Sequence, residues 1–298
     1  MKIKSTEVID TFAEAFKMFG TRFIITAETK QWAMAAAQSV TGFATSVIGC
    51  KCEAGIEAEI PAHDSPDGRP GVSVLFFTMD ADSIQNRLIE RIGQCVMTCP
   101  STACYSGLHE GNVITVGGQL RYFGDGFQIS KMLKDQRLWR IPVMDGEFVV
   151  DDRFHVQEAV GGGNLLILGK NQKATLRAAT AATKAMRELP DIILPFPNGV
   201  VRSGSKVGSR YKSLIASTND AYCPTLRSVS KQTALDDDIN CVLEIVIDGL
   251  SLAAVEEAMR VGLHAAAKPG IKQLSAGNYG GGLGQYQIRL LPLLEAEG

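Results

Sequence analysis

The sequence has almost no excess charge of either sign and no long hydrophobic run. Its 30 Lys and Arg nearly balance its 32 Asp and Glu, so the formal net charge over 298 residues is -2. Without a broad basic field, nucleic acid is a poor candidate partner. No apolar stretch approaches the roughly 18 residues of a membrane-spanning helix, and acidic residues interrupt the N-terminal stretch that a signal peptide would need. We expect a soluble, cytoplasmic protein with no nucleic acid or membrane partner.

Metal-binding signals are also scarce. The four histidines lie far apart, and the seven cysteines form no CxxC pair. The spacings Cys50-x-Cys52 and Cys95-x3-Cys99-x4-Cys104 could be imagined as metal ligands, but no histidine completes a zinc or iron pattern. An odd number of unpaired thiols fits reduced cysteines. We therefore expect no metal, and thiols that are mostly structural.

The chain contains two copies of one strand-and-helix pattern. In each copy a short apolar strand leads through a polar turn into an Ala-rich helix, over 22–40 in the first and 164–182 in the second. Each later element of the first copy also has a counterpart in the second copy. These are second strands at 45–49 and 192–196, third strands at 72–79 and 241–247, helices at 84–96 and 255–266, and fourth strands at 101–105 and 271–276. The order β-α-β-β-α-β is that of a ferredoxin-like unit.

The fold class that follows is α+β, with two duplicated ferredoxin-like lobes and helices on one face of each antiparallel sheet. Residues 111–158 have no counterpart in the second copy. They contain strand-like pieces at 113–116, 119–122, 138–142 and 148–150. We predict an N-terminal lobe over 1–158, with a β-rich insertion at about 111–158, and a C-terminal lobe over 159–298. The boundary, at the glycine run 161–163, is expected to be a turn.

One carboxylate, Glu244, lies in the middle of the apolar run 241–247. When Asp80 is aligned with Asp248, Phe76 falls opposite Glu244, so an apolar side chain satisfies the same position in the other copy. A buried carboxyl costs several kcal/mol unless it is paired or protonated. Alternation along the strand places Glu244 on the sheet face opposite the helices. Glu244 is a candidate acid or base, although a half-exposed strand that points it to water explains it as well.

Four loops could build a site. The loop 202–212 sets four cations among glycines and hydroxyls, which suits phosphate or carboxylate but also suits a solvated loop. The turn 66–71 holds one arginine. The segment 217–224 gathers polar groups that an Asx turn would equally explain. The glycines of 277–284 allow backbone to approach a planar ligand. No P-loop, dinucleotide fingerprint or Cys/His dyad is present.

Ten longer segments carry a resemblance to a known family. They are 10–16, 41–48, 53–56, 66–72, 91–98, 122–126, 205–209, 216–225, 244–250 and 275–280. In this order and at near-constant spacing they resemble the formylmethanofuran:tetrahydromethanopterin formyltransferases nearly from end to end. The departures are in 107–137 and at the C-terminus. Family members from strict anaerobes are often strongly acidic, whereas this chain is near neutral and is more similar to a mesophilic enzyme of one-carbon oxidation. The direction of formyl transfer therefore stays open.

The resemblance implies two related lobes and a homo-oligomer, either a dimer or a tetramer. It also implies that methanofuran and tetrahydromethanopterin are co-substrates, that no metal or covalently bound cofactor is used, and that other subunits of a formyltransferase/hydrolase complex are possible partners. Under this interpretation, Glu244 shuttles a proton during formyl transfer to N5 of the pterin, and Asn219 or Ser217 stabilises the oxyanion. The other expected substrate-binding residues are Arg69, Arg202, Lys206, Arg210, Asp220, Tyr222 and Asn278.

Two alternatives belong to other classes. One is a non-catalytic subunit that binds the pterin carrier or serves assembly. The other is a cysteine-dependent acyltransferase that uses Cys223 or Cys95.

Overall fold

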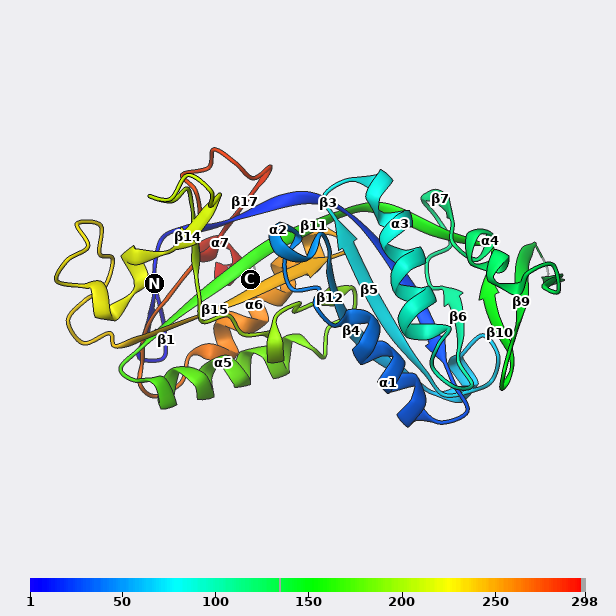
Figure 1. The fold of residues 1–298 in the computed structure, drawn as a ribbon. Helices are drawn as coiled ribbons and strands as arrows, with labels where there is room; N and C mark the ends of the chain where they lie inside the picture. Colours follow the sequence, from blue (N-terminus) through cyan, green and yellow to red (C-terminus); the bar gives the residue numbers. More distant parts are fainter. Residues whose placement is uncertain (134, 296–298) are drawn as a thin grey trace. The chain divides into compact units, whose positions relative to one another are not determined.

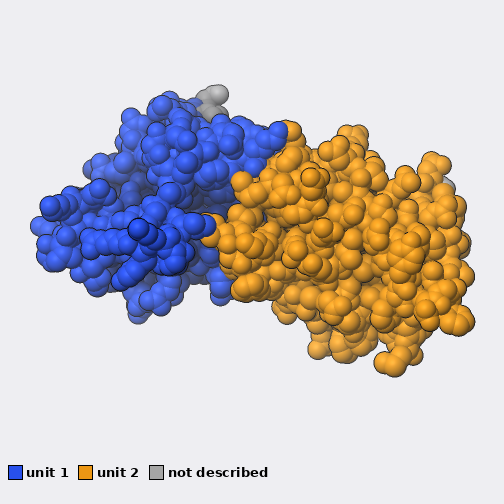
Figure 2. Space-filling view, turned by 45° about the horizontal axis from the view of Figure 1, so that its top comes forward, with its two compact units in different colours: residues 1–17, 160–298 blue, residues 18–159 orange. Residues whose placement is uncertain are grey.

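The computed structural model describes residues 1–133 and 135–295, which divide into two compact units (Figures 1 and 2). Unit 1 holds residues 1–17 together with those from 160 onward, and unit 2 holds residues 18–159. The chain passes from unit 1 to unit 2 within strand β3 (Phe12–Thr26) and returns within strand β11 (Arg153–Gly169). Each unit has its own hydrophobic core.

Unit 1 is built on a sheet in which helices cover one face. The strand order is β12 (Ile192–Ile193), β15 (Cys241–Gly249), β11, β16 (Ile271–Ser275), β2 (Thr6–Val8) and β1 (Lys2–Ile3). All neighbours are antiparallel except β16 and β2. Helices α5 (Gln172–Met186) and α6 (Leu252–Ala266) lie side by side (Figure 1), and their alanines join the strand side chains in one core. The small alanine side chains let the two helices approach each other closely.

Capping side chains define where these helices begin. Asn171 precedes α5 and its side chain accepts a hydrogen bond from the backbone N–H of Ala174 at 2.9 Å. Ser251 does the same for α6 with the N–H of Ala254 at 3.1 Å. Each satisfies one of the unpaired N–H groups at a helix start, worth about 1 kcal/mol.

The rest of unit 1 forms short elements. They are β13 (Ser205–Val207), β14 (Ala216–Thr218), β17 (Tyr286–Arg289), α7 (Leu290–Glu295) and 3-10 turns at Pro197–Gly199, Asp220–Tyr222 and Pro224–Leu226. Strands β13 and β14 form a separate hairpin, while β17 pairs with the start of β3. Strand β13 and the turns after β14 carry some of the polar side chains of the site described below.

Unit 2 is also built on a sheet with helices packed on it. Its strand order is β4 (Glu53–Ile60), β5 (Gly71–Thr78), β3, β6 (Ala103–Ser106), β10 (Gly146–Asp151), β9 (Gln136–Val143) and β8 (Ile129–Leu133), with β7 (Asn112–Thr115) paired to the start of β11. Helix α1 (Lys30–Thr41) and helix α3 (Ala81–Arg91), which continues as a π-helical turn at Ile92–Val96, pack on the sheet. Shorter pieces are α2 (Val47–Cys50), α4 (Gly117–Leu120) and 3-10 turns at Ala62–Asp64 and Arg121–Gly124.

The sequence prediction of a mixed α+β protein is confirmed, but three local predictions are wrong. Residues 45–49 enter helix α2, because Ser46 caps a helical turn at the N–H of Ile48; the strand that follows is β4. Residues 119–122 are helical rather than extended. The glycine run 161–163 lies inside β11, where Gly162 has φ +79° at a bulge between Val160 and Gly163.

Among residues 1–133 and 135–295, no helix is both long and apolar enough to cross a bilayer.

Candidate functional site

A small cavity of about 70 Å³ in unit 1 holds Glu244 on its wall. Separate stretches of the chain supply the lining, and most of the side chains are polar. The lining residues are Asn164, Leu166, Val201–Ser205, Asn219, Tyr222, Cys223, Val242–Glu244 and Gly277–Tyr279. Such a convergence of polar groups from distant segments is typical of a binding or active site.

Strand pairing fixes the direction of the Glu244 side chain. In β15 the flanking Leu243 and Ile245 belong to the buried core under the helices, so alternation turns Glu244 to the opposite sheet face. On one side Glu244 lies opposite Leu166 of β11. On the other, its backbone exchanges two hydrogen bonds with Val201, of 2.7 and 2.9 Å. The sequence prediction for this strand is thereby confirmed.

The Glu244 carboxyl is half-buried and, among the residues that the structure describes, has no hydrogen-bonding or ionic side-chain partner. Burial alone raises its pKa from 4.5 to about 7, because the charged form loses hydration that nothing replaces. A carboxyl with this pKa is present in both protonation states near neutral pH. It can therefore accept a proton and return it.

Four other predicted residues share the cavity with Glu244: Asn219, Tyr222, Arg202 and Asn278. Arg202 is exposed. Tyr222 packs, together with Val242, against a small buried cluster formed by Leu166, Leu168, Leu235 and Ile239. The Asn278 amide donates to the Thr11 hydroxyl and the Phe12 carbonyl, both at 3.2 Å, so its NH₂ group is already used by the scaffold.

Four further predicted residues line a second groove, of about 860 Å³: Ser217, Lys206, Arg210 and Asp220. Lys206 forms an ion pair with Asp220, and this hydrogen bond together with one from Ser230 lowers the pKa of Asp220. The Ser217 hydroxyl donates to the Gly208 carbonyl at 2.7 Å. These four residues therefore lie outside the Glu244 cavity, and their roles stay predictions.

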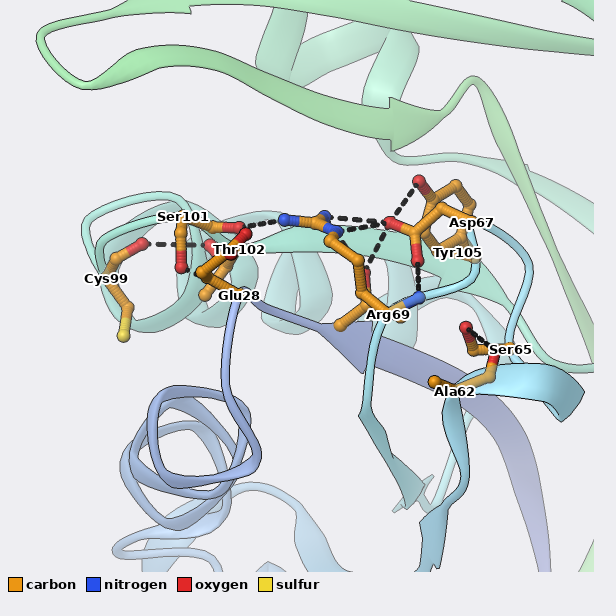
Figure 3. Close-up of polar contacts among 10 residues, drawn as sticks. Glu28, Ala62, Ser65, Asp67, Arg69, Cys99, Ser101, Thr102 and Tyr105 are labelled. Atoms are coloured by element: carbon orange, nitrogen blue, oxygen red, sulfur yellow. Dashed lines mark hydrogen bonds and ion pairs between the residues drawn. The ribbon is translucent and has the colours of Figure 1, made fainter.

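Arg69 lies in unit 2, where it is part of a hydrogen-bond network (Figure 3). Its guanidinium donates to the Asp67 carboxylate at 2.7 Å, to the Ser101 carbonyl at 2.5 Å and to the Thr26 hydroxyl at 3.1 Å. Tyr105 donates to the same carboxylate at 3.1 Å. Despite the burial of Asp67, these bonds hold its pKa below the ordinary value. The guanidinium thus stabilises the turn 66–71, and its role in substrate binding stays a prediction.

Sequence reasoning missed several residues of the cavity, notably Asn164, Ser205 and Tyr279. Asn164 donates to the carbonyls of Gly162 and Gly277 at 3.2 and 3.1 Å, and accepts from the Gly277 N–H. The signal was a polar residue at the start of an otherwise apolar strand, as for Glu244. Tyr279 lies within the glycine-rich segment 277–284, of which the sequence prediction named the backbone and Asn278 but not the tyrosine.

Cys223 also lines the cavity. Its thiol lies 3.4 Å from the Thr218 hydroxyl and 3.3 Å from the Asn219 carbonyl. No histidine is among the lining residues, so the described site offers Cys223 no imidazole base. Across residues 1–133 and 135–295, no three His, Cys, Asp or Glu side chains gather as metal ligands would.

Comparisons with known proteins cover the whole chain. Residues 1–143 match the family described as formylmethanofuran-tetrahydromethanopterin formyltransferase, and residues 146–293 match its proximal lobe. The chain is 54% identical to the formylmethanofuran–tetrahydromethanopterin formyltransferase of Methylobacillus flagellatus, over 99% of this chain and 100% of that one. It is 52% identical to a component of the formyltransferase/hydrolase complex of Methylorubrum extorquens, over 98% and 97% respectively.

Two solved structures share the fold. One is the formyltransferase/hydrolase complex from Methylorubrum extorquens with methylofuran, with TM-score 0.96, 51% identity and coverage of 99% and 98%. The other is the formyltransferase from Methanosarcina barkeri, with TM-score 0.94, 43% identity and coverage of 99% and 100%. By sequence along its full length and by fold, the chain belongs to the formylmethanofuran–tetrahydromethanopterin formyltransferase family.

Proposed function

We propose that this chain is a formyltransferase that moves a formyl group between formylmethanofuran and N5 of tetrahydromethanopterin. The observation that carries the proposal is the Glu244 carboxyl, which has no side-chain partner within the described part of the chain and a pKa raised to about 7, on the wall of a polar cavity. The names of its relatives supply the two carriers. Both partners react through a nitrogen, so the reaction needs a group that moves protons at neutral pH.

The reaction is acyl transfer between two amines. N5 attacks the formyl carbon, a C–N bond forms, and the carbonyl electron pair moves to oxygen. The ionised Glu244 takes the proton from N5 and delivers it to the amide nitrogen of the furan carrier. The C–N bond to that nitrogen then breaks, the carbonyl reforms, and the free amine leaves. Atoms and electrons balance without an oxidant, and Glu244 returns to its starting state.

Asn219 is our candidate for the donor that stabilises the oxyanion, because it shares the cavity with Glu244. Ser217 would have to release the Gly208 carbonyl to take part. A neutral amide is suited to this role since it donates a hydrogen bond without competing for the proton that Glu244 carries.

The cavity is too small to hold two whole carriers, so only their reacting ends can meet there. A larger groove of about 1,090 Å³ shares Arg202, Val242 and Leu243 with the cavity and also includes Lys184 and Arg187. We infer that the body of one carrier lies along this groove while its reacting end enters the cavity. Arg202 would then lie where the two parts of the carrier meet. The second groove, with Lys206 and Arg210, would hold anionic groups of the other carrier.

We also infer that each unit contains one ferredoxin-like repeat. The strand order β12-β15-β11-β16 in unit 1 matches β4-β5-β3-β6 in unit 2, each with two helices on one face. Strands β7 to β10 would then be the insertion of the first lobe. Further proposals are a dimer or tetramer of this chain and, from the name of one relative, assembly with other subunits of a formyltransferase/hydrolase complex.

The proposal is tested with purified chain, formylmethanofuran and tetrahydromethanopterin, by following formyl-pterin formation and, in reverse, its consumption. We expect turnover in both directions from this chain alone. Pterin binding without any turnover would contradict the proposal and favour a non-catalytic carrier-binding or assembly subunit.

A thiol mechanism is the second rival, because Cys223 lies in the cavity. We expect Cys223→Ala to keep kcat within about fivefold of wild type, since a thiol without a histidine base is a weak nucleophile near pH 7. Loss of turnover in Cys223→Ala, with Glu244→Gln still active, would support the thiol instead.

A further inference from the structure

The Glu14 carboxylate is buried and binds the backbone of one loop. Glu14 is only 1% exposed. One carboxylate oxygen accepts from the N–H groups of Tyr279 and Gly281 at 2.7 and 2.9 Å. The other accepts from Leu283 and Gly284, both at 2.6 Å. Burial raises its pKa, but these four hydrogen bonds outweigh burial, so the pKa of Glu14 is lowered and the carboxylate stays charged at neutral pH.

The sequence of the loop fits this arrangement. A Cβ at Gly284 would lie 2.5 Å from the Ala15 carbonyl and 2.7 Å from Cγ of Glu14. Gly280 and Gly281 have φ values of +73° and +77°, which suit glycine. The glycines therefore let the backbone wrap around one carboxylate, and the energy of the wrap comes from charge-assisted hydrogen bonds.

The loop also carries a side chain into the Glu244 cavity. Tyr279 lines that cavity, and its ring packs against Phe16 with centroids 6.2 Å apart. Burial, then the negative charges of Glu244 and Glu14, raise the pKa of the Tyr279 phenol, against a hydrogen bond with Ser205. The phenol is thus close enough to sense the Glu244 charge, and it remains a hydrogen-bond donor at neutral pH.

We propose that Glu14 is a positioning residue: through four hydrogen bonds to the loop backbone it holds Tyr279 at the Glu244 cavity, where the phenol donates a hydrogen bond to the reacting group. This inference rests on the proposed formyl transfer. Glu14 itself contacts no substrate in this scheme. Its carboxylate is suited to the task because it offers only acceptors, whereas an amide at the same place would oppose two N–H groups with its own NH₂.

The first measurement follows amide hydrogen exchange in the loop and does not depend on turnover. In wild type we expect slow exchange at Tyr279, Gly281, Leu283 and Gly284. Glu14→Gln should speed their exchange at least tenfold and leave helix α6 unchanged, which shows that unit 1 remains folded. The matched control is Glu7→Gln, an exposed side chain on strand β2, which removes the same charge away from the loop. Fast exchange of the four amides in wild type, or no change in Glu14→Gln, overturns the proposal.

The second measurement is a double-mutant cycle in formyl transfer. We expect Glu14→Gln and Tyr279→Phe each to lower kcat about tenfold or more, and the double variant to be little slower than either one, because both remove the same contact. General loosening of the fold would instead give independent, multiplying losses. Multiplying losses, or an unchanged kcat in either variant, overturn the proposal.

A third variant disturbs the same contact without changing Glu14, so the proposal can still be tested if Glu14→Gln does not fold. Gly284→Ala pushes the loop away from the carboxylate through the 2.5 Å contact with the Ala15 carbonyl. We expect it to repeat the faster loop exchange and the lower kcat, and normal values of both count against the proposal. If wild type transfers no formyl group, the proposed function fails, and the exchange measurement still decides whether Glu14 holds the loop.

Discussion

At the scale of single residues, the site depends on two carboxylates with opposite environments. Glu14 accepts from four N–H donors and stays ionised, while Glu244 has no donor among the described residues that compensates its burial, and its pKa is raised to about 7. Glu14 is almost fully buried and Glu244 is half-buried, so burial raises the pKa of both, and hydrogen bonding is what separates them. A sequence shows that Glu244 interrupts an apolar strand. It does not show which backbone N–H groups will surround Glu14, because those come from a loop 265 to 270 residues away.

The raised pKa of Glu244 has a consequence for stability. The folded state holds the proton more tightly than the unfolded chain, since the pKa rises from 4.5 to about 7 on folding. The stabilisation is complete below about pH 4.5 and is lost as the pH rises to about 7. We therefore expect the free energy of unfolding of wild type to fall over this range relative to Glu244→Gln, by at most about 3 kcal/mol.

This is measured by urea unfolding of the two proteins at intervals from pH 4.5 to 8. Groups common to both proteins cancel in the difference. A difference that stays constant across the range would mean that the Glu244 side chain is solvated in the folded protein.

At the scale of elements, close packing between β11 and α6 determines the wall behind the site. Gly163 of β11 lies under Val255 of α6, and a Cβ there would be 2.3 Å from a Val255 methyl group. A β-branched side chain in a helix has little freedom to turn away. The strand therefore needs glycine at this position for the helix to approach.

We expect Gly163→Ala to lower the free energy of unfolding by about 1–3 kcal/mol, the usual range for overpacking. Urea unfolding measures it. Gly49→Ala is the control, because a Cβ at this exposed glycine meets no atom within 4 Å; its stability should not fall, since alanine is favoured over glycine in the helical turn α2. Equal stability of Gly163→Ala and wild type would show that α6 can shift outward freely.

Sequence periodicity predicted most of these elements but failed where local hydrogen bonds of a few residues determine the backbone conformation. The helices over 31–40 and 173–182 appear as α1 and α5 because their alanines recur at helical spacing and capping residues precede them. The segment 45–49 looked extended from its β-branched residues, yet the Ser46 cap and the left-handed Lys51 form a helical turn. Such local hydrogen bonds are not visible in apolar periodicity.

At the scale of the whole molecule, residues far apart in the sequence make each unit. Residues 1–17 pack with residues from 160 onward, and this packing brings Glu14 to the loop 277–284. No local pattern in the first seventeen residues indicates it. The duplicated pattern did locate Glu244, and the cavity gathers five of the ten predicted site residues, Glu244 included. Arg69 was predicted as a substrate-binding residue from its charge and from the resemblance over 66–72, although in the structure its guanidinium donates hydrogen bonds within unit 2.

In the proposed mechanism Glu244 moves the proton during formyl transfer, and the pH dependence of kcat is the decisive measurement. We expect wild-type kcat to vary with an apparent pKa near 7, the value that burial gives this carboxyl. Glu244→Gln should lower kcat at least 100-fold and remove that dependence, with carrier binding unchanged. A Glu244→Gln enzyme with kcat within threefold of wild type and the same pH profile would contradict this mechanism.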